Sequence, residues 1–296
     1  MNTFPSDAQS INESQLRNLA RQMGKLDAMA FDVDGTIADG ESYVSDRTIA
    51  ALRALSERGI EIIIVTGRLW DSAAEIMRRA GHDGIAIGSN GAIIGHSSTG
   101  EIFHSQPLTA DESRTIIEIG KKYDLITTIF SEDSIYVEQL DMSSDFLKGA
   151  HQNLPIKVQD FSTIEPHHIF KMMFGHMDAS YLDEISPEIL KHCPSAQRSI
   201  DNFFDIASLS EGKGKAMRIV AEKTGISLDR VAGFGDGGND VEWLEIIGWP
   251  VAMGNARAEV KDISRACIGH HADDAVAQFL EIYVDEFDRE FADEQS

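Results

Sequence analysis

The stretch FDVDGTIADG at positions 31–40 places two carboxylates at the end of an apolar run. Residues 28–34, AMAFDVD, have the composition of a buried strand that ends in Asp32 and Asp34. Two like charges about 4 Å apart repel by roughly 4 kcal/mol at an effective dielectric constant near 20. A cation bound at this point would remove that repulsion, so the stretch indicates a binding site at the end of a strand.

The flanking segments alternate between helix and strand, and this alternation predicts the fold class. A helix is predicted over residues 45–58, with its apolar side chains facing inward. The run IEIIIVTGR at 60–68 is almost continuously apolar, as expected of a strand covered on both faces. A helix over 70–80 and a short strand within 84–92 follow. The pattern is typical of right-handed βαβ units on a parallel sheet.

The middle of the chain has a different pattern of predicted elements. Residues 106–200 mix helix-like and strand-like pieces without regular alternation, which indicates an inserted α+β cap domain. The alternating pattern resumes afterwards, so residues 27–105 and 201–296 are assigned to one core. The predicted fold class is α/β, with a doubly wound, Rossmann-like parallel-sheet core and the inserted cap. Residues 1–26 form an N-terminal extension that is predicted to be partly helical.

The composition limits the partners and the compartment. The 296 residues carry a formal net charge of −23, which disfavours a nucleic-acid backbone or an anionic membrane as a partner. No apolar run approaches the ~20 residues that span a bilayer, and we recognise no signal peptide. Cys193 and Cys267 lie outside any C-x-x-C pattern, which favours free or buried thiols in a reducing cytoplasm. No motif indicates an oligomeric state.

Polar residues suited to chemistry occur at several predicted strand ends and at one helix start. In open parallel sheets, ligands bind where the carboxyl ends of the strands meet the following loops. Each residue alone has a simpler explanation, as a turn, a solvated lysine or an acid at a helix N-terminus. Their joint occurrence in this order favours one shared site. The candidates are Asp32, Asp34, Thr66, Gly67, Lys213, Asp236 and Asp240.

A calcium-binding loop is an alternative for the first of these motifs. An EF-hand needs glycine at position six and glutamate at position twelve of its loop. Counted from Asp32, the glycine is fourth and the twelfth residue is Tyr43. The spacing therefore excludes an EF-hand.

Four of these segments resemble the motifs of a known superfamily. DVDGT, VTGR, EGKGKAM and GFGDGGNDVEWL occur in the order found in the haloacid dehalogenase superfamily phosphatases. SNGAII and VAMGNARAEVK resemble companion segments of the Cof-like, class IIB branch. The resemblance spans residues 29 to 279, and between the motifs the cap matches the branch only in position and size.

The resemblance implies hydrolysis of phosphate monoesters of small metabolites, with sugar phosphates as the first expectation. Phosphate monoesters hydrolyse very slowly unaided, and a covalent aspartyl-phosphate divides the large barrier into two smaller ones. Asp32 matches the nucleophile. Asp34 matches the general acid that protonates the leaving oxygen and later, as a base, activates water.

The resemblance also implies ligands for a magnesium ion and for the phosphoryl group. The residues implied to bind Mg²⁺ are Asp32, Asp34 through its backbone carbonyl, Asp236, and Asp240 directly or through a water molecule. Those implied to bind phosphoryl oxygens are Thr66, Gly67 through its amide, Asn239 and Lys213. Lys213 would also offset negative charge in the transition state.

Three other functions remain open on the sequence. A phosphotransferase or phosphomutase would use the same aspartyl-phosphate and pass it to a second hydroxyl. A haloacid dehalogenase would need neither a metal nor an acid at Asp34, so Asp34 and Asp236 argue against it. A non-catalytic regulatory protein could keep the same fold.

Overall fold

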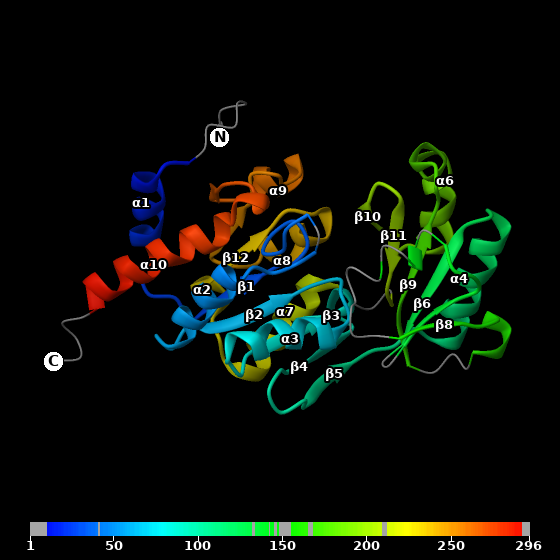
Figure 1. The fold of residues 1–296 in the computed structure, drawn as a ribbon, viewed down its shortest axis with the longest axis horizontal. Coiled ribbons are helices and arrows are strands. Elements are labelled where there is room, and N and C mark those ends of the chain that lie inside the picture. Colours follow the sequence, from blue (N-terminus) through cyan, green and yellow to red (C-terminus); the bar gives the residue numbers. More distant parts are fainter. Residues whose placement is uncertain are drawn as a thin grey trace. The chain divides into compact units, whose positions relative to one another are not determined.

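The computed structural model describes residues 11–40, 42–131, 134–141, 143–144, 147, 155–164, 168–208 and 212–291. The chain divides into two compact units (Figure 1). The first unit comprises Met1–Ile64, Ile76–Gly84 and Met217–Ser296, and the second comprises Val65–Glu75 and Ile85–Ala216. Residues 1–10 of the predicted N-terminal extension lie outside the described residues.

The first unit is built on a parallel sheet with strand order β14-β13-β12-β1-β2. The order is not sequential, because the chain enters at β1, moves outward to β2 and later returns to β12. This reversal is the doubly wound arrangement that the alternating sequence predicts. In chain order the strands are β1 (Ala28–Phe31), β2 (Glu61–Val65), β12 (Val231–Gly235), β13 (Trp249–Ala252) and β14 (Ala266–Cys267).

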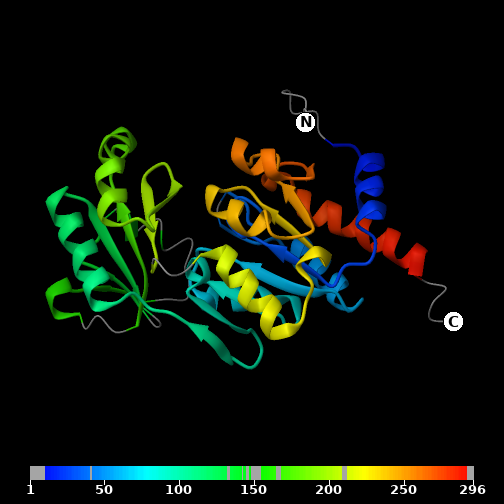
Figure 2. The same ribbon diagram turned by 180° about the vertical axis from the view of Figure 1, so that it is seen from behind.

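Helices cover both faces of this sheet. Figures 1 and 2 show α2 and α10 over one face and α7 over the other. Helices α3 and α7 begin in the second unit and end in the first. The helices are α1 (Glu13–Met23), α2 (Asp46–Ser56), α3 (Trp70–Ala80), α7 (Lys213–Thr224), α8 (Val241–Leu244), α9 (Ala258–Ile263) and α10 (Ala275–Phe291), with short 3₁₀ turns η3 (Leu228–Arg230), η4 (Gly238–Asp240) and η5 (His271–Asp273).

Stacked aromatic rings join the central strands to α10. The rings of Phe31 on β1 and Phe234 on β12 stack with their centroids 5.2 Å apart. The Phe279 ring on α10 lies 5.5 Å from that of Phe234. All three side chains are fully buried. Because β1 and β12 are covered on both faces, their sequences are apolar throughout rather than alternating.

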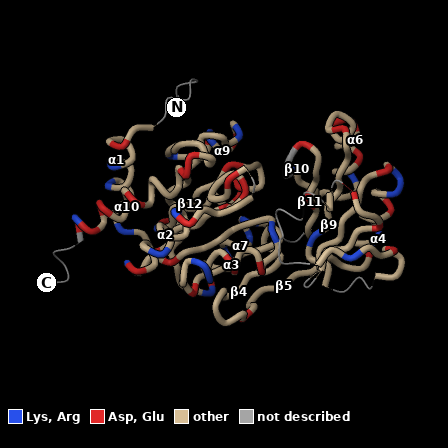
Figure 3. The backbone as a smooth tube through the Cα atoms, viewed as in Figure 1, with Lys and Arg blue, Asp and Glu red and all other residues tan. Residues whose placement is uncertain are grey.

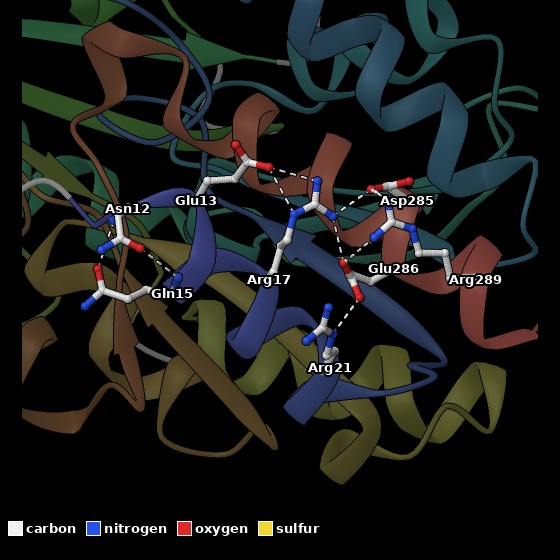
Figure 4. A network of polar contacts seen from close by, with 8 residues as sticks. All are labelled: Asn12, Glu13, Gln15, Arg17, Arg21, Asp285, Glu286 and Arg289. Atoms are coloured by element: carbon white, nitrogen blue, oxygen red, sulfur yellow. Dashed lines mark hydrogen bonds and ion pairs between the residues drawn. The ribbon is translucent and has the colours of Figure 1, made fainter.

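Ion pairs connect the N-terminal helix α1 to α10 (Figure 4). Arg17 Nη1 donates to Asp285 Oδ2 over 2.6 Å and to Glu286 Oε1 over 2.7 Å, and Arg21 Nε donates to Glu286 Oε2 over 2.6 Å. The hydrogen bonds that Arg21 and Arg17 donate to Glu286 lower the pKa of its carboxyl group to about 2. Asp285 and Glu286 of α10 are therefore partners of α1.

The second unit contains an antiparallel group and a larger sheet. Strands β3 (Ile85–Gly88), β4 (Ile93–His96) and β5 (Ile102–Ser105) pair antiparallel, with the turn η1 (Ser89–Gly91) between the first two. The six-stranded sheet has the order β10-β11-β9-β6-β7-β8 and is antiparallel except between β7 and β8. Its strands are β6 (Ile126–Ser131), β7 (Ile135–Val137), β8 (Ile156–Val158), β9 (Ile169–Gly175), β10 (Gln197–Ile200) and β11 (Phe203–Ile206).

Two helices bury their apolar sides on the six-stranded sheet. Helices α4 (Ala110–Lys122) and α6 (Ala179–His192) contribute Ile116, Leu182 and Ile189 to a core that includes Phe174 of β9. A 3₁₀ turn, η2 (Phe161–Thr163), adds Phe161 to the same core. The prediction of an α/β fold with an α+β insertion is confirmed. The boundaries of the predicted cap, residues 106 and 200, stay a prediction.

The structure differs from the predicted elements in two places. Strands β4 and β5 add antiparallel pairs after β3, whereas only one short strand was predicted there. The segment DVEWLEIIG at 240–248 predicts one continuous helix, whereas α8 ends at Leu244 and the Gly248 N–H donates to Leu228 O over 2.8 Å. Neither difference alters the strand ends that carry the candidate residues.

Both signs of charge occur along both units, with acidic residues in excess (Figure 3). Within the described part of the chain, no helix combines the length and the apolar character needed to cross a membrane. Cys193 is buried and Cys267 is half-buried, and both are free thiols. Burial raises the pKa of the Cys193 thiol to about 11, so this side chain is an inert part of the core.

Candidate active site

The turn after β1 separates Asp32 from Asp34. The Asp32 N–H donates to Phe234 O over 3.0 Å, so Asp32 continues the pairing with β12, and it is only 6% exposed. The backbone N–H groups of Thr36, Ile37 and Ala38 all donate to Val33 O, and these bonds close a tight turn. Asp34 lies on that turn and is exposed. One aspartate is thus fixed by the sheet, whereas the other is open to solvent.

Three acidic side chains converge at the carboxyl ends of β1 and β12. One carboxylate oxygen from each of Asp32, Asp236 and Asp240 lies within 4.8 Å of the other two. Asp32 and Asp240 are buried and Asp236 is half-buried. The two strands are neighbours in the sheet, so residues that follow them meet at the same edge although about two hundred positions separate them in sequence.

Asp240 holds the loop that follows β12. Its Oδ2 accepts hydrogen bonds from the Asp236 N–H over 3.0 Å and the Gly237 N–H over 2.9 Å. Its Oδ1 accepts from Trp243 Nε1 over 2.9 Å, and Trp243 is fully buried. Both oxygens of Asp240 are therefore engaged by the protein. This arrangement fixes the backbone from which the Asp236 side chain extends.

A second set of contacts fixes the Asp236 carboxylate itself. Asn255 Nδ2 donates to Asp236 Oδ2 over 3.1 Å and to Gly35 O over 2.8 Å, while Asn255 Oδ1 accepts from the His271 N–H over 3.1 Å. Thr36 Oγ1 donates to the other carboxylate oxygen of Asp236 over 3.4 Å. Asn255 lies in the segment VAMGNARAEVK, but no local pattern predicts this role for it.

The acidic cluster fits a divalent cation. Its donors are carboxylate oxygens, the ligands that Mg²⁺ prefers. Three carboxylates so close together repel one another. The hydrogen bonds from Trp243 and Asn255 bring no positive charge to the cluster. A dication among these oxygens would turn that repulsion into attraction.

In the second unit, the turn after β2 carries Thr66 and Gly67. The Thr66 N–H donates to Ile87 O, and Thr66 O accepts from the Asn90 N–H, each over 3.0 Å. Thr66 Oγ1 accepts from the Arg68 N–H over 3.1 Å, and Thr66 is fully buried. A β-carbon on Gly67 would lie 3.1 Å from Asn90 Oδ1, so this turn is closely packed on one side.

Lys213 lies at the start of α7 and is only 2% exposed. The preceding residue, Gly212, is close to η1, because a β-carbon on Gly91 would lie 2.6 Å from Gly212 O. Since the neighbouring Asn90 binds Thr66 O, the loop at 89–91 joins the turn at Thr66 to the start of α7. The second unit thus brings Thr66, Gly67 and Lys213 to one region around this loop.

Asn239 belongs to the first unit, on η4 beside the acidic cluster. Its Oδ1 would lie 2.6 Å from a β-carbon on Gly237, so the side chain folds back over the loop after β12. The first unit therefore holds Asp32, Asp34, Asp236, Asn239 and Asp240. The second holds Thr66, Gly67 and Lys213.

Residues 29–280 match the family of haloacid dehalogenase-like hydrolases. The chain belongs to this family. Phosphatase YwpJ of Bacillus subtilis (strain 168) is 26% identical over 283 residues, an alignment that covers 85% of this chain and 98% of the relative. The sequence-based prediction of a Cof-like phosphatase of the haloacid dehalogenase superfamily is confirmed by these matches.

Solved structures of haloacid dehalogenase-like hydrolases share the fold. One from Bacteroides thetaiotaomicron has a TM-score of 0.77 at 22% identity, covering 87% of this chain and 99% of that chain. A second, described as the subclass IIB sugar phosphatase BT4131, has a TM-score of 0.71 at 24% identity and covers 86% of this chain and 97% of that chain. Because these alignments cover 87% and 86% of this chain, the shared fold extends beyond the parallel core into the insertion.

Proposed function

We propose that this haloacid dehalogenase-like hydrolase cleaves phosphate monoesters of small metabolites, with Mg²⁺ as cofactor and an aspartyl-phosphate intermediate. The observation that carries the proposal is the convergence of Asp32, Asp236 and Asp240 within 4.8 Å. Clustered carboxylates at strand ends supply both a nucleophile and cation ligands. Sugar phosphates are the first substrate class to test, since the structural neighbour BT4131 is described as a sugar phosphatase.

Asp32 is the proposed nucleophile. A carboxylate oxygen of Asp32 forms a bond to phosphorus while the bond from phosphorus to the leaving oxygen breaks. Its backbone pairing with β12 and its burial support this role, because a fixed nucleophile loses little freedom when it attacks.

Asp34 is the proposed general acid and base. It protonates the leaving oxygen in the first step, and then takes a proton from the water whose oxygen attacks phosphorus. Attack on phosphorus releases inorganic phosphate and regenerates the Asp32 carboxylate. After the first step Asp34 is a carboxylate, ready to act as the base, and the proton that it takes from water restores the acid for the next turnover. Its exposed position on the turn supports this role, because both the leaving oxygen and the attacking water can reach it.

Asp32, Asp236 and the backbone carbonyl of Asp34 would hold Mg²⁺. Asp240, whose two oxygens already accept protein hydrogen bonds, would hold it through a water molecule or contact it directly. When bound, the ion neutralises negative charge that the carboxylates and the phosphoryl group bring together. The carboxylates keep fixed positions because Asp240 and Asn255 hold the loop and the Asp236 side chain.

Thr66, the Gly67 amide, Asn239 and Lys213 are the proposed phosphate ligands. Hydrogen-bond donors that are already in place stabilise charge in the transition state without reorganisation. The buried position of Lys213 strengthens its electrostatic effect, since a charge acts more strongly in a medium of low dielectric constant. The predicted cap over residues 106–200 would exclude water and contact the leaving group.

We further propose a cytoplasmic enzyme that acts on a soluble phosphorylated metabolite. The two free thiols are typical of a reducing compartment. The net charge of −23 disfavours nucleic acids and anionic membranes as partners.

Release of inorganic phosphate from a panel of esters tests the proposal. The panel contains sugar phosphates, nucleotides and phosphorylated cofactors, each assayed with Mg²⁺ and with a chelator. We expect Mg²⁺-dependent release, fastest with a sugar phosphate. Formation of a new phosphorylated acceptor in place of free phosphate would favour a phosphotransferase. Absence of turnover across the panel would favour a non-catalytic protein.

A further inference from the structure

A charged pair lies inside the six-stranded sheet of the second unit. All seven residues of β9 are buried, and the sequence IFKMMFG has Lys171 in its interior. All four residues of the neighbouring strand β11 are also buried, and its sequence FFDI contains Asp205. Lysine and aspartate are almost never fully buried unless they are paired. Lys171 is 5% exposed and Asp205 is 7% exposed.

The pair reaches the turn that follows β2. Lys171 Nζ donates to Asp205 Oδ2 over 2.8 Å and to Gly67 O over 3.1 Å. The same nitrogen lies 4.9 Å from the centre of the Phe130 ring, a favourable position for a cation. A β-carbon on Gly67 would lie 3.3 Å from Asp205 Oδ2. Both members of the pair therefore lie against Gly67.

These contacts fix the two peptide groups that flank Gly67. Thr66 O, in the peptide group that contains the Gly67 N–H, accepts from the Asn90 N–H over 3.0 Å. Gly67 O, in the following peptide group, accepts from Lys171. Peptide groups are planar, so the bond at Thr66 O sets the direction of the Gly67 N–H. The bond from Lys171 to Gly67 O holds the next peptide group, so the two bonds together restrict rotation about the backbone of Gly67.

The sheet has other sources of stability besides this pair. Strands β9 and β11 are joined by an antiparallel ladder over four residue pairs, with apolar side chains such as Phe174 and Phe204 in the core beside it. Replacing a buried ion pair by apolar residues of similar volume is often neutral or stabilising. The charges at these two positions therefore call for a role other than stability.

We propose that Lys171 and Asp205 are positioning residues for phosphate binding. Lys171 holds the Gly67 carbonyl and Asp205 holds Lys171, so the turn keeps the shape in which the Gly67 amide faces a phosphoryl oxygen. The inference rests on the proposed function, in which that amide is a phosphate ligand. It adds two residues that act on phosphate binding through the turn and do not touch the substrate.

The test compares phosphate affinity with stability in four variants. Lys171→Met with Asp205→Leu removes both charges and leaves no unpaired charge behind. Lys171→Met alone leaves Asp205 without its partner, and Lys171→Arg keeps a donor at the same place. Lys121→Met is the matched control, because Lys121 is an exposed lysine of the same unit that pairs with Glu138 over 3.8 Å. The readouts are Ki for inorganic phosphate, KM and kcat for one ester, and the unfolding temperature.

We expect the unfolding temperature of the double variant to lie within a few degrees of that of the wild type. Its Ki for phosphate and its KM should rise about tenfold or more, because a well-oriented hydrogen bond to the phosphoryl group is lost. Lys171→Arg should recover most of the loss, and Lys121→Met should match the wild type. If the double variant is active and its Ki and KM equal those of the wild type, the positioning role is wrong, while the proposed function is unaffected. A wild type that neither hydrolyses esters nor binds phosphate would overturn both.

Discussion

Asp236 lies so close to Gly35 that a β-carbon on Gly35 would be 2.3 Å from Asp236 Oδ2. Gly35 also has φ +79°, a backbone conformation that residues with side chains rarely adopt. The turn after β1 and the loop after β12 therefore fit together only with glycine at this position. This contact places the Asp236 carboxylate beside the backbone of the turn that carries the two aspartates Asp32 and Asp34.

Gly35→Ala should weaken Mg²⁺ binding by roughly 10–100-fold, the usual effect of disturbing groups around a metal ligand. The added methyl group would displace either the Asp236 carboxylate or the turn. Titration calorimetry with Mg²⁺ measures the change. Gly40→Ala is the control, because a β-carbon there meets nothing within 4 Å. Unaltered affinity in Gly35→Ala would show that the cluster is not the ion's site.

Asn255→Leu should also weaken Mg²⁺ binding by roughly 10–100-fold. The substitution removes the hydrogen bonds from Nδ2 to Asp236 Oδ2 and to Gly35 O, so the carboxylate loses its orientation. Asn202→Leu in the second unit provides the comparison, since Asn202 Nδ2 also donates two hydrogen bonds, in this case to the backbone carbonyls of His176 and Met177. Equal effects of the two substitutions on Mg²⁺ affinity would contradict a specific role for Asn255.

Asp34→Ala should separate the two chemical steps when the substrate is an aryl phosphate. An aryl oxide leaves without a proton, so formation of the aspartyl-phosphate proceeds, while its hydrolysis lacks a base. We expect a rapid initial release of aryl alcohol, followed by a steady rate reduced at least about 100-fold.

Stopped-flow absorbance measures both phases of that reaction. Asp39→Ala, which changes an exposed aspartate of the same segment, should behave as the wild type. Near-normal hydrolysis of alkyl phosphates by Asp34→Ala would rule out its acid role, because an alkyl oxide is a poor leaving group without a proton.

The contribution of Glu286 to stability should depend on pH. Hydrogen bonds from Arg21 and Arg17 lower its pKa from 4.5 to about 2. A carboxyl group with a lowered folded-state pKa stabilises the fold above its unfolded-state pKa, and this contribution is lost as the pH falls from 4.5 toward 2. Glu286→Gln should therefore lower the free energy of unfolding at pH 7, and the difference from the wild type should shrink below pH 4.5.

Urea unfolding over a pH series measures that difference for as long as the folded state persists. The control is Glu290→Gln, since Glu290 is an exposed residue of the same helix. A difference between wild type and Glu286→Gln that does not change with pH would show that the ion pairs are not its source.

The sequence predicted the parallel core because its signals are local. Continuous apolar runs at β1, β2 and β12 identify buried strands, and the helices between them require parallel neighbours. Parallel strands have their carboxyl ends at the same edge of the sheet, so Asp32 and Asp236, which follow β1 and β12, are predicted to lie at that edge. The antiparallel strands β4 and β5 were not predicted, because their short, partly exposed sequences carry a weaker pattern.

The residues that support the site could not be predicted from local patterns. Asn255 binds Gly35 across 220 positions of sequence, and Lys171 binds Gly67 across 104. No spacing rule predicts which distant residue will be bound by an asparagine that follows a strand or by a lysine within a strand. Only the folded chain shows that both act on glycines beside candidate catalytic residues.

Phosphate release by Asp32→Asn is the most direct test of the central claim that Asp32 attacks phosphorus. The substrate is the best ester of the panel, with Mg²⁺ present, and the unfolding temperature is measured on the same samples. We predict that kcat falls at least about 10³-fold, as expected when a nucleophile is removed, while the protein stays folded. A folded Asp32→Asn variant that keeps more than about a tenth of the wild-type kcat, far above the loss expected for a nucleophile, would contradict the account.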